Sequence, residues 1–268
     1  MALPTKTAEQ VQRMRVAGLV VAETLAEVRS AIGPGVTPRD LDALAAEAIA
    51  RRGAVPSFLG YHGYPATICT SVNDVVVHGI PDDRPLAPGD VISVDCGAIV
   101  DGWHGDAAIT VGVGELAEPV QDLVAVCEAA LWAGIAAMTP QARLGDIGAA
   151  VEQTVRARGR YGILTDFTGH GIGTAMHEPP FVPNYRTRRR GPRLDVGVVL
   201  AIEPMITLGS PQVSVEPDGW TVRTDDGSVS AHVEHTVAIT PRGPWVLTAL
   251  EDDTGPRGQA AGTTSSAS

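Results

Sequence analysis

The residues from Val91 to Val111 place two acidic side chains on either side of a predicted turn. Two apolar, β-prone runs flank Asp101-Gly102, a dipeptide typical of tight hairpin turns, and each run carries one carboxylate, Asp95 or Asp106. A turn that closes on Val100-Asp101 or on Asp101-Gly102 sets these carboxylates directly or diagonally across the ladder. Their Cβ atoms are then about 5 Å apart in the direct register and somewhat farther apart in the diagonal one.

Two such acids in an apolar strand pair can have either of two roles. Ionised carboxylates repel one another and are costly to bury, and one or two divalent cations between them would relieve both costs. Alternatively, each Asp caps a turn or accepts backbone hydrogen bonds. The hairpin alone does not separate these roles, so other residues have to decide.

Composition narrows the class of protein. The 268 residues are 44% hydrophobic, enough for one large domain or two small ones. The net charge of −11 argues against nucleic acid or an anionic membrane as the main partner. No apolar run approaches the roughly 20 residues that span a bilayer, and the N-terminus has no apolar signal region. Cys69, Cys96 and Cys127 form no C-x-x-C pair, which fits a reducing cytoplasm.

Capping residues and periodicity predict an alternation of helices and strands. Thr7 with Gln10 forms a capping box, and Thr37-Pro38 is typical of a helix start. The predicted helices cover residues 7–32, 37–53, 119–138 and 146–158. The predicted strands cover residues 66–71, 75–79, the two arms of 91–111, 198–206, 213–222 and 231–240. We expect residues 1–250 to form one domain and residues 251–268, rich in Gly, Thr, Ser and Ala, to be a disordered tail.

A weak internal repeat relates the two halves of the chain. Gly89 lies six residues before Asp95 at the end of an apolar strand, and Gly197 lies six residues before Glu203 in the same way. The preceding helices also match, with Asp40-Leu41 through Gly53 aligning with Asp146-Ile147 through Gly159. The repeat predicts two related α+β halves that face one another across a pseudo-two-fold axis, with acids from both halves meeting at the centre.

Four carboxylates and one imidazole are the candidate metal ligands: Asp95, Asp106, His170, Glu203 and Glu234. All except His170 lie on predicted apolar strands, where an unpaired charge is costly. Such an oxygen-rich set suits Mn, Fe, Co or Zn and can hold two ions about 3.5–4 Å apart, with an acidified water as a hydrolytic nucleophile. Taken singly, His170 can be structural, Glu203 can end an exposed strand and Glu234 can face solvent.

Two common zinc-protease patterns are excluded. His177-Glu178-Pro179-Pro180 is not H-E-x-x-H, because its prolines prevent the helix that this pattern needs. His232 and His235 flank Glu234, but residues three apart on a strand point to opposite faces of the sheet.

A series of motifs, in this order, resembles type I methionine aminopeptidase. The motifs are V-V-H-G-I-P around His78, the two hairpin aspartates, T-G-H-G-I-G at 168–173, H-E-P-P at 177–180, I-E-P-M at 202–205 and E-H-T at 234–236. The resemblance extends from about Thr7 to Leu250. It implies the α+β pita-bread fold, two pseudo-symmetric halves of antiparallel sheet covered by helices, which agrees with the internal repeat.

The resemblance also implies a reaction. A metal-dependent aminopeptidase of this kind removes the initiator methionine from nascent proteins when the second residue is small, and a metal-bridged hydroxide attacks the scissile carbonyl. By resemblance, Asp95, Asp106, His170, Glu203 and Glu234 bind two divalent ions (Co, Mn, Fe or Zn). Asp106 and Glu234 are then the bridging pair, and Glu203 doubles as a proton shuttle.

The remaining site residues implied by the resemblance contact the substrate. His177 meets the scissile carbonyl and steadies the tetrahedral intermediate, and His78 meets the scissile amide nitrogen. The methionine pocket is lined by Phe58, Tyr61, Tyr64, Cys69 and Trp220, and an apolar pocket with sulfur and rings suits a thioether. The alternative for these five residues is ordinary core packing.

The expected partners are the N-termini of nascent polypeptides, and the protein is expected to be a cytoplasmic monomer that binds neither DNA nor membrane. The basic run Arg186–Arg190, with Arg193, is either a solvated loop or a contact with ribosomal RNA. Two other functions compete. Proline-specific peptidases of this fold usually carry an extra N-terminal domain, which this chain is too short to hold. Metal-free binding modules tend to lose the ligands that this chain retains.

Overall fold

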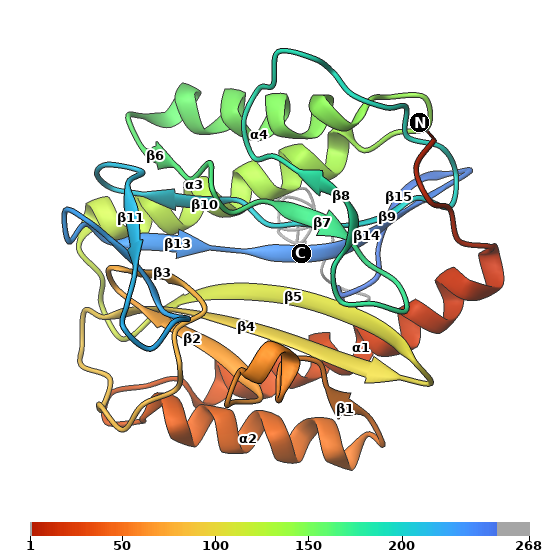
Figure 1. Ribbon diagram of the computed structural model, residues 1–268. Coiled ribbons are helices and arrows are strands. Elements are labelled where there is room, and N and C mark those ends of the chain that lie inside the picture. Colours follow the sequence, from red (N-terminus) through yellow and green to blue (C-terminus); the bar gives the residue numbers. More distant parts are fainter. Residues whose placement is uncertain (1, 251–268) are drawn as a thin grey trace, which may run out of the picture.

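The computed structural model describes residues 2–250. A curved antiparallel sheet of nine strands lies between two pairs of helices (Figure 1). Helices α1 (Ala8–Ala31) and α2 (Pro38–Arg51) cover one side, and α3 (Glu118–Ala137) and α4 (Leu144–Arg158) cover the other. The main strand order is β1-β4-β5-β14-β9-β7-β8, with β2 paired to β4 and β15 paired to β14. Strands from both ends of the sequence therefore meet at the centre of the sheet.

The large sheet consists of β1 (Val55–Pro56), β2 (Ile68–Val72), β4 (Val91–Val100), β5 (Trp103–Gly112), β7 (Gly169–Gly171), β8 (Glu178–Val182), β9 (Val199–Ile202), β14 (Glu234–Thr240) and β15 (Gly243–Val246). Two smaller sheets have three strands each. The first contains β6 (Gly162–Ile163), β10 (Met205–Thr207) and β13 (Ser230–His232), and the second contains β3 (Val75–Val77), β11 (Val213–Val215) and β12 (Val222–Thr224). A short 3₁₀ helix, η1, spans Tyr61–Gly63.

Helices α1 and α2 begin where their capping residues predict. Thr7 and Gln10 form a reciprocal capping box on α1, and Thr37 and Asp40 form another on α2. Helices α3 and α4 begin one and two residues earlier than predicted. Helix α1 lies so close to β5 that there is no room for a side chain at Gly105. A Cβ atom there would lie 2.8 Å from the backbone nitrogen of Gly18. This contact holds α1 directly against the strand that carries Asp106.

The 91–111 hairpin closes on Asp101-Gly102, both with positive φ, and pairs Val100 with Trp103. In this register Asp95 lies opposite Ala108, and Asp106 lies opposite Gly97. The two acids are therefore diagonal neighbours on one hairpin, which is one of the two expected arrangements.

Three predicted strands are interrupted. The 213–222 prediction is wrong, because residues 216–221 turn back between β11 and β12 and the Asp218 carboxylate accepts hydrogen bonds from the backbone N–H groups of Trp220 and Thr221. The 198–206 run breaks at Glu203-Pro204, between β9 and β10, and the 231–240 run breaks at Val233. The predicted tail, 251–268, lies outside the described residues.

Each pair of helices packs on its own core. The larger cluster of buried side chains lies under α3 and α4, and a second cluster lies under α1 and α2. Within residues 2–250, α3 is the one helix long and apolar enough to cross a membrane by length and composition. Its Leu123, Val126, Ala130 and Leu131 are nevertheless buried in the larger cluster, as expected for a core helix.

Candidate metal centre

The five candidate ligands come from five strands that are neighbours in the sheet. Asp95 is on β4, Asp106 on β5, Glu234 at the start of β14, His170 on β7, and Glu203 directly follows β9. All five are buried. The strand order β4-β5-β14-β9-β7 therefore assembles, at the centre of the sheet, residues that are up to 139 positions apart in sequence.

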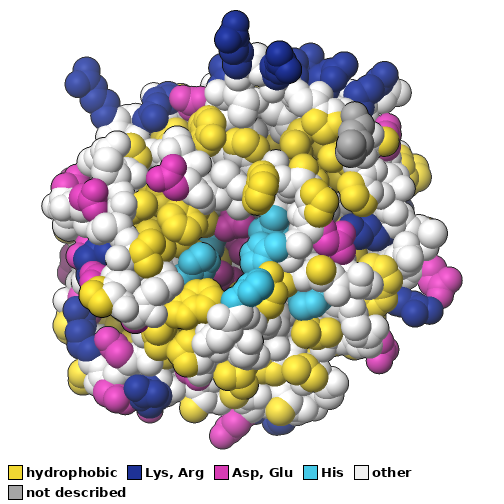
Figure 2. Space-filling view, viewed as in Figure 1, with side chains coloured by type: hydrophobic (Ala, Val, Ile, Leu, Met, Phe, Trp, Pro, Cys, Tyr) yellow, Lys and Arg dark blue, Asp and Glu magenta, His cyan; other side chains and the backbone are white. Residues whose placement is uncertain are grey.

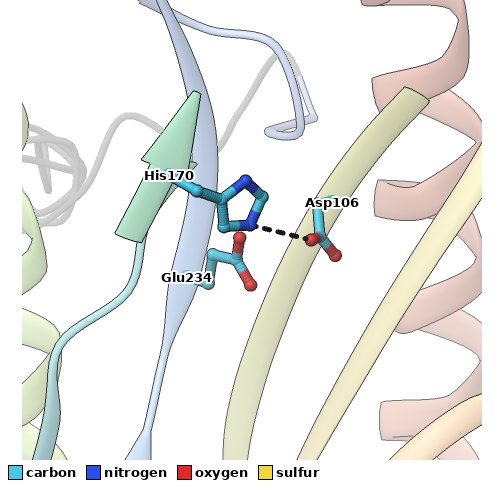
Figure 3. Close-up of side chains that lie close together, drawn as sticks. All are labelled: Asp106, His170 and Glu234. Carbon is cyan, nitrogen blue, oxygen red and sulfur yellow. Dashed lines mark ion pairs between the residues drawn. The ribbon is translucent and has the colours of Figure 1, made fainter. Parts of the chain in front are cut away.

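The side chains point toward one another. Figure 3 shows the His170 ring, on β7, directed at Asp106 on β5 and Glu234 on β14. The His170 Nε2 atom lies 3.7 Å from Asp106 Oδ2 and 3.6 Å from Glu203 Oε1. These separations exceed those of good hydrogen bonds, about 2.7–3.2 Å. They are close to the roughly 3.4 Å expected between two donor atoms bound tetrahedrally to one ion at about 2.1 Å.

Several buried oxygens at the cluster lack a partner. Within the described part of the chain, Asp95 Oδ1, Asp106 Oδ1 and Glu234 Oε1 are buried side-chain atoms without a hydrogen bond. Buried polar atoms are nearly always satisfied, so three unsatisfied carboxylate oxygens side by side call for a cation. Ligand atoms of Asp106, His170 and Glu234 also lie within 4.8 Å of one another. The residues present thus fit a divalent metal.

Burial and mutual repulsion shift the pKa values of the acids upward. Burial raises the pKa of Asp95 to about 7. The pKa values of Asp106, Glu203 and Glu234 also lie well above their usual range, first through burial and then through the neighbouring carboxylates. Burial, reinforced by nearby His177, lowers the pKa of His170 to about 4. The imidazole is therefore neutral near pH 7 and available as a ligand.

Hydrogen bonds to the surrounding structure hold the ligands in place. The Asp106 N–H donates to Thr236 Oγ1 at 3.1 Å, and the Thr236 hydroxyl donates back to the Asp106 carbonyl at 2.8 Å. The Asn184 amide donates to the Glu203 carbonyl at 3.0 Å. His170 Nδ1 lies 2.9 Å from the Gly171 carbonyl, which leaves Nε2 facing the acids.

Sequence reasoning missed His232 as part of the cluster. Its Nε2 atom is buried without a hydrogen bond and lies 3.7 Å from Glu203 Oε2. His235 does point away, with its Nδ1 atom 2.9 Å from Thr248 Oγ1, as expected for the opposite face. The sequence feature that points to His232 is its two-residue spacing from Glu234, because residues two apart on a strand lie on the same face.

An apolar pocket adjoins the acids. Phe58, Tyr64, Cys69 and Met176 are buried there, and Tyr61, Ile80 and Trp220 pack against them. The cavity between this wall and the acids measures about 130 Å³. Figure 2 shows acidic side chains recessed at its base, flanked by histidines and bordered by hydrophobic groups. The structure thus places every expected pocket residue beside the candidate ligands. A larger cavity of about 570 Å³, between α2 and the β11–β12 hairpin, contains none of these ligands.

The other two expected histidines stand at the mouth of the pocket. The His177 ring lies 4.3 Å from the His170 ring, and its Nδ1 atom lies 2.8 Å from the Tyr61 hydroxyl. The His78 ring packs edge-on against Phe167 and Trp220 at 5.7 and 6.4 Å. The φ of His78 is +59°, a strained conformation that is common at functional sites. Both imidazoles line the same cavity as the acids.

Comparison with known proteins identifies the family to which this chain belongs. Residues 12–241 match the model of metallopeptidase family M24. The chain belongs to metallopeptidase family M24. A curated relative, methionine aminopeptidase 1 of Mycobacterium tuberculosis, is 52% identical over 252 residues, covering 92% of this chain and 95% of the relative.

Solved structures agree. The crystal structure of methionine aminopeptidase from Thermotoga maritima has a TM-score of 0.90 at 42% identity and covers 92% of this chain and 100% of that one. The expected pita-bread α+β fold is confirmed. A prolidase from Pyrococcus furiosus shares the fold with a TM-score of 0.74 at 22% identity, but only 66% of that chain is covered. The chain therefore has the fold of the M24 metallopeptidases and a buried acid–histidine cluster that fits a divalent metal.

Proposed function

We propose that this M24 protein is a methionine aminopeptidase that hydrolyses the Met–Xaa bond at protein N-termini when Xaa is small. The observation that carries the proposal is a small apolar pocket of rings and sulfur that ends directly on a buried acid–histidine cluster. Such a pocket accepts one unbranched apolar side chain at the end of a chain. The M. tuberculosis and T. maritima relatives, both named methionine aminopeptidases, support the same activity.

We infer that the five ligands would hold two divalent ions, and that Asp106 and Glu234 would contribute to both. Four carboxylates and one neutral imidazole suit Mn, Fe, Co or Zn. When bound, such ions polarise the scissile carbonyl and acidify a water for attack. The unpartnered oxygens of Asp95, Asp106 and Glu234 support this assignment.

The protein's own side chains position the substrate. The methionine side chain enters the pocket, where its thioether contacts Tyr64, Trp220 and Cys69, and sulfur–ring contacts are favourable. In this proposal the Tyr61 hydroxyl, 2.8 Å from His177 Nδ1, donates its hydrogen to that atom, which leaves the proton on Nε2 to be donated to the carbonyl oxygen. His78, held between Phe167 and Trp220, meets the scissile amide nitrogen.

Glu203 is the proton carrier in this proposal. Its pKa lies well above the usual range because it is buried and close to Glu234 and Asp95. A carboxylate with a raised pKa can take a proton from the attacking water and return it to the leaving amine near neutral pH. The limit to small second residues follows from a cramped site next to the scissile bond, since overpacking costs about 1–3 kcal/mol.

A peptide panel tests the function. Metal-stripped protein, reconstituted separately with Mn, Fe, Co or Zn, should release methionine from Met-Ala-Ser and Met-Gly-Ser but not from Met-Leu-Ser. A proline-specific peptidase would instead cleave an Xaa-Pro dipeptide, and a metal-free binding module would cleave neither and bind no metal. Cleavage of the Xaa-Pro control in preference to Met-Ala-Ser would refute the proposal.

The raised carboxylate pKa values predict that metal binding releases protons. At pH 6 Asp95, with a pKa of about 7, is mostly protonated and must ionise to act as a ligand, whereas His170, with a pKa of about 4, is already neutral. The affinity for the metal should therefore depend on pH. For each proton that binding releases, it should fall about ten-fold for every unit by which the pH is lowered between 8 and 6. Titration calorimetry in buffers of different ionisation enthalpy measures this release, and an affinity independent of pH would contradict it.

We further propose that residues 1–250 act as one catalytic domain, in the cytoplasm and as a monomer.

The basic run Arg186–Arg190 also has a proposed partner. Arg190 is paired to Asp146 at 2.5 Å, while Arg186, Arg188 and Arg189 are exposed and can face ribosomal RNA. Charge reversal at these three arginines should weaken co-sedimentation with ribosomes.

A further inference from the structure

The N-terminal segment reaches across the molecule to the turn that carries His177. Before α1 begins, the Lys6 N–H donates to the Gly197 carbonyl at 2.7 Å, in the turn that precedes β9. The Lys6 ammonium then donates to Glu178 Oε2, also at 2.7 Å. Figure 1 shows this segment on the side of the molecule where β8, β9 and β15 lie. Residues 172 positions apart are thus linked next to the proposed active site.

The link is largely shielded from solvent. The Lys6 and Glu178 side chains are only 9% and 19% exposed, whereas the Arg13–Glu9 pair on α1 is 57% and 76% exposed. Exposed pairs contribute little, but removing one partner of a shielded pair leaves the other charge without compensation. The space around the pair is also restricted, because a Cβ atom on Gly173 would lie 2.4 Å from Glu178 Oε1 and 2.8 Å from Lys6 Cε.

The Glu178 carboxylate of this pair also contacts the turn from Gly173 to Glu178. Glu178 Oε1 accepts a hydrogen bond of 3.4 Å from the Ala175 N–H, and the Gly173 N–H donates to the Ala175 carbonyl at 3.2 Å. His177 is exposed between these points, and its side chain contacts the Tyr61 hydroxyl and the His170 ring. Glu178 is therefore one of the groups that fix the backbone aiming His177, together with the His104 N–H, which donates to the Gly173 carbonyl at 2.9 Å.

We propose that Lys6 is a positioning residue for the reaction: through Glu178 it fixes the 173–178 turn and so aims His177 at the substrate carbonyl. This inference rests on the proposed peptidase function. It assigns a role in turnover to a segment that lies before the first helix and contributes no side chain to the pocket. A displacement of about 1 Å at a catalytic group can cost as much as a hundred-fold in rate.

The test compares Lys6→Met with Arg13→Met in the full-length, metal-loaded protein. Lys6→Met keeps the aliphatic stem and removes the charge. We expect kcat for Met-Ala-Ser to fall by about ten- to a hundred-fold, with KM within about two-fold and the metal stoichiometry unchanged. Hydrogen exchange should accelerate in residues 173–178. Arg13→Met, which removes an exposed pair from the same end of the chain, should leave all four measurements unchanged.

Two further variants separate a specific link from general damage. Glu178→Gln keeps one acceptor oxygen, enough for Lys6 or for the Ala175 N–H but not for both, and should have a turnover between those of the wild type and Lys6→Met. The double variant Lys6→Met/Glu178→Ala should be no slower than either single variant, because all three break the same link. Wild-type turnover in Lys6→Met, unchanged exchange in residues 173–178, or a rate loss that follows metal loss would each overturn the proposal. If the wild-type protein released no methionine, the proposed function would fail, and hydrogen exchange would still decide whether Lys6 holds the turn.

Discussion

Asp106→Asn is expected to abolish methionine release because the protein can no longer hold its metal. Asp106 lies between Asp95 on the same hairpin and His170 on β7, and one of its buried oxygens has no hydrogen-bond partner. The amide has nearly the same shape, but it carries no charge and only one oxygen. Since loss of a group that merely supports a ligand costs about 10–100-fold in metal affinity, loss of a shared ligand should cost at least about 100-fold.

The fold should survive this substitution. The hydrogen bonds between Asp106 and Thr236 involve the backbone of Asp106, so they persist in the variant. Removing one of several repelling buried carboxylates also relieves electrostatic strain in the metal-free protein. We therefore expect a normal circular dichroism spectrum, an unchanged or raised Tm without metal, and a Tm that no longer rises when metal is added.

The matched control is Asp101→Asn, at the turn of the same hairpin. Asp101 is exposed, and its φ of +48° is one that Asn adopts readily. This variant should bind metal and release methionine at the wild-type rate. The paired measurements are metal stoichiometry by elemental analysis, affinity by calorimetry, and turnover of Met-Ala-Ser. An Asp106→Asn protein that binds metal normally would remove Asp106 from the ligand set.

The hairpin illustrates how far local sequence determines a site. The Asp101-Gly102 turn fixes the pairing of Val100 with Trp103, and every later pair in the ladder follows from it. The diagonal relation of Asp95 and Asp106 was therefore predictable from a dipeptide and a count of residues. The same logic was available at Pro217-Asp218-Gly219, a strong turn signal, but the apolar residues around it led to a continuous strand over 213–222, which the structure contradicts.

Contacts between site residues that are far apart in the sequence are harder to predict from the sequence. Glu234 meets Asp106 because β14 inserts between β5 and β9, an order that no local pattern encodes. The internal repeat suggested that acids from both halves converge, and the resemblance in the motifs named the ligands. Neither indicated His232 or Lys6. The contribution of Lys6 depends on a contact across 172 positions, which only the folded chain reveals.

His177→Ala is expected to keep the metal and lose most of the turnover. His177 is not within the buried ligand cluster: it lies at the mouth of the cavity, exposed, with its ring 4.3 Å from that of His170. Its proposed task is to donate a hydrogen bond as charge develops on the carbonyl oxygen. Removing one donor of this kind costs about 10²–10³-fold in kcat, and the effect on KM should be small because the interaction strengthens mainly in the transition state.

The contact between Tyr61 and His177 predicts a second, smaller effect on kcat. The Tyr61 hydroxyl lies 2.8 Å from His177 Nδ1, and the proposed mechanism has it donate to that atom, which favours the tautomer that carries its proton on Nε2. Tyr61→Phe should therefore lower kcat by a smaller factor than His177→Ala, and adding Tyr61→Phe to His177→Ala should cost little more. A double-mutant cycle on kcat for Met-Ala-Ser measures this coupling.

His235→Ala is the matched histidine control. His235 is on β14 beside Glu234, but it faces Thr248 and Trp132 on the other side of the sheet. Its loss should leave the cavity, the metal stoichiometry and kcat unchanged, apart from any loss of stability. If His177→Ala turned over at a near-normal rate, carbonyl stabilisation would have to come from the metal cluster alone. If His177→Ala lost its metal, His177 would instead contribute to metal binding, either as a ligand or through its contact with His170.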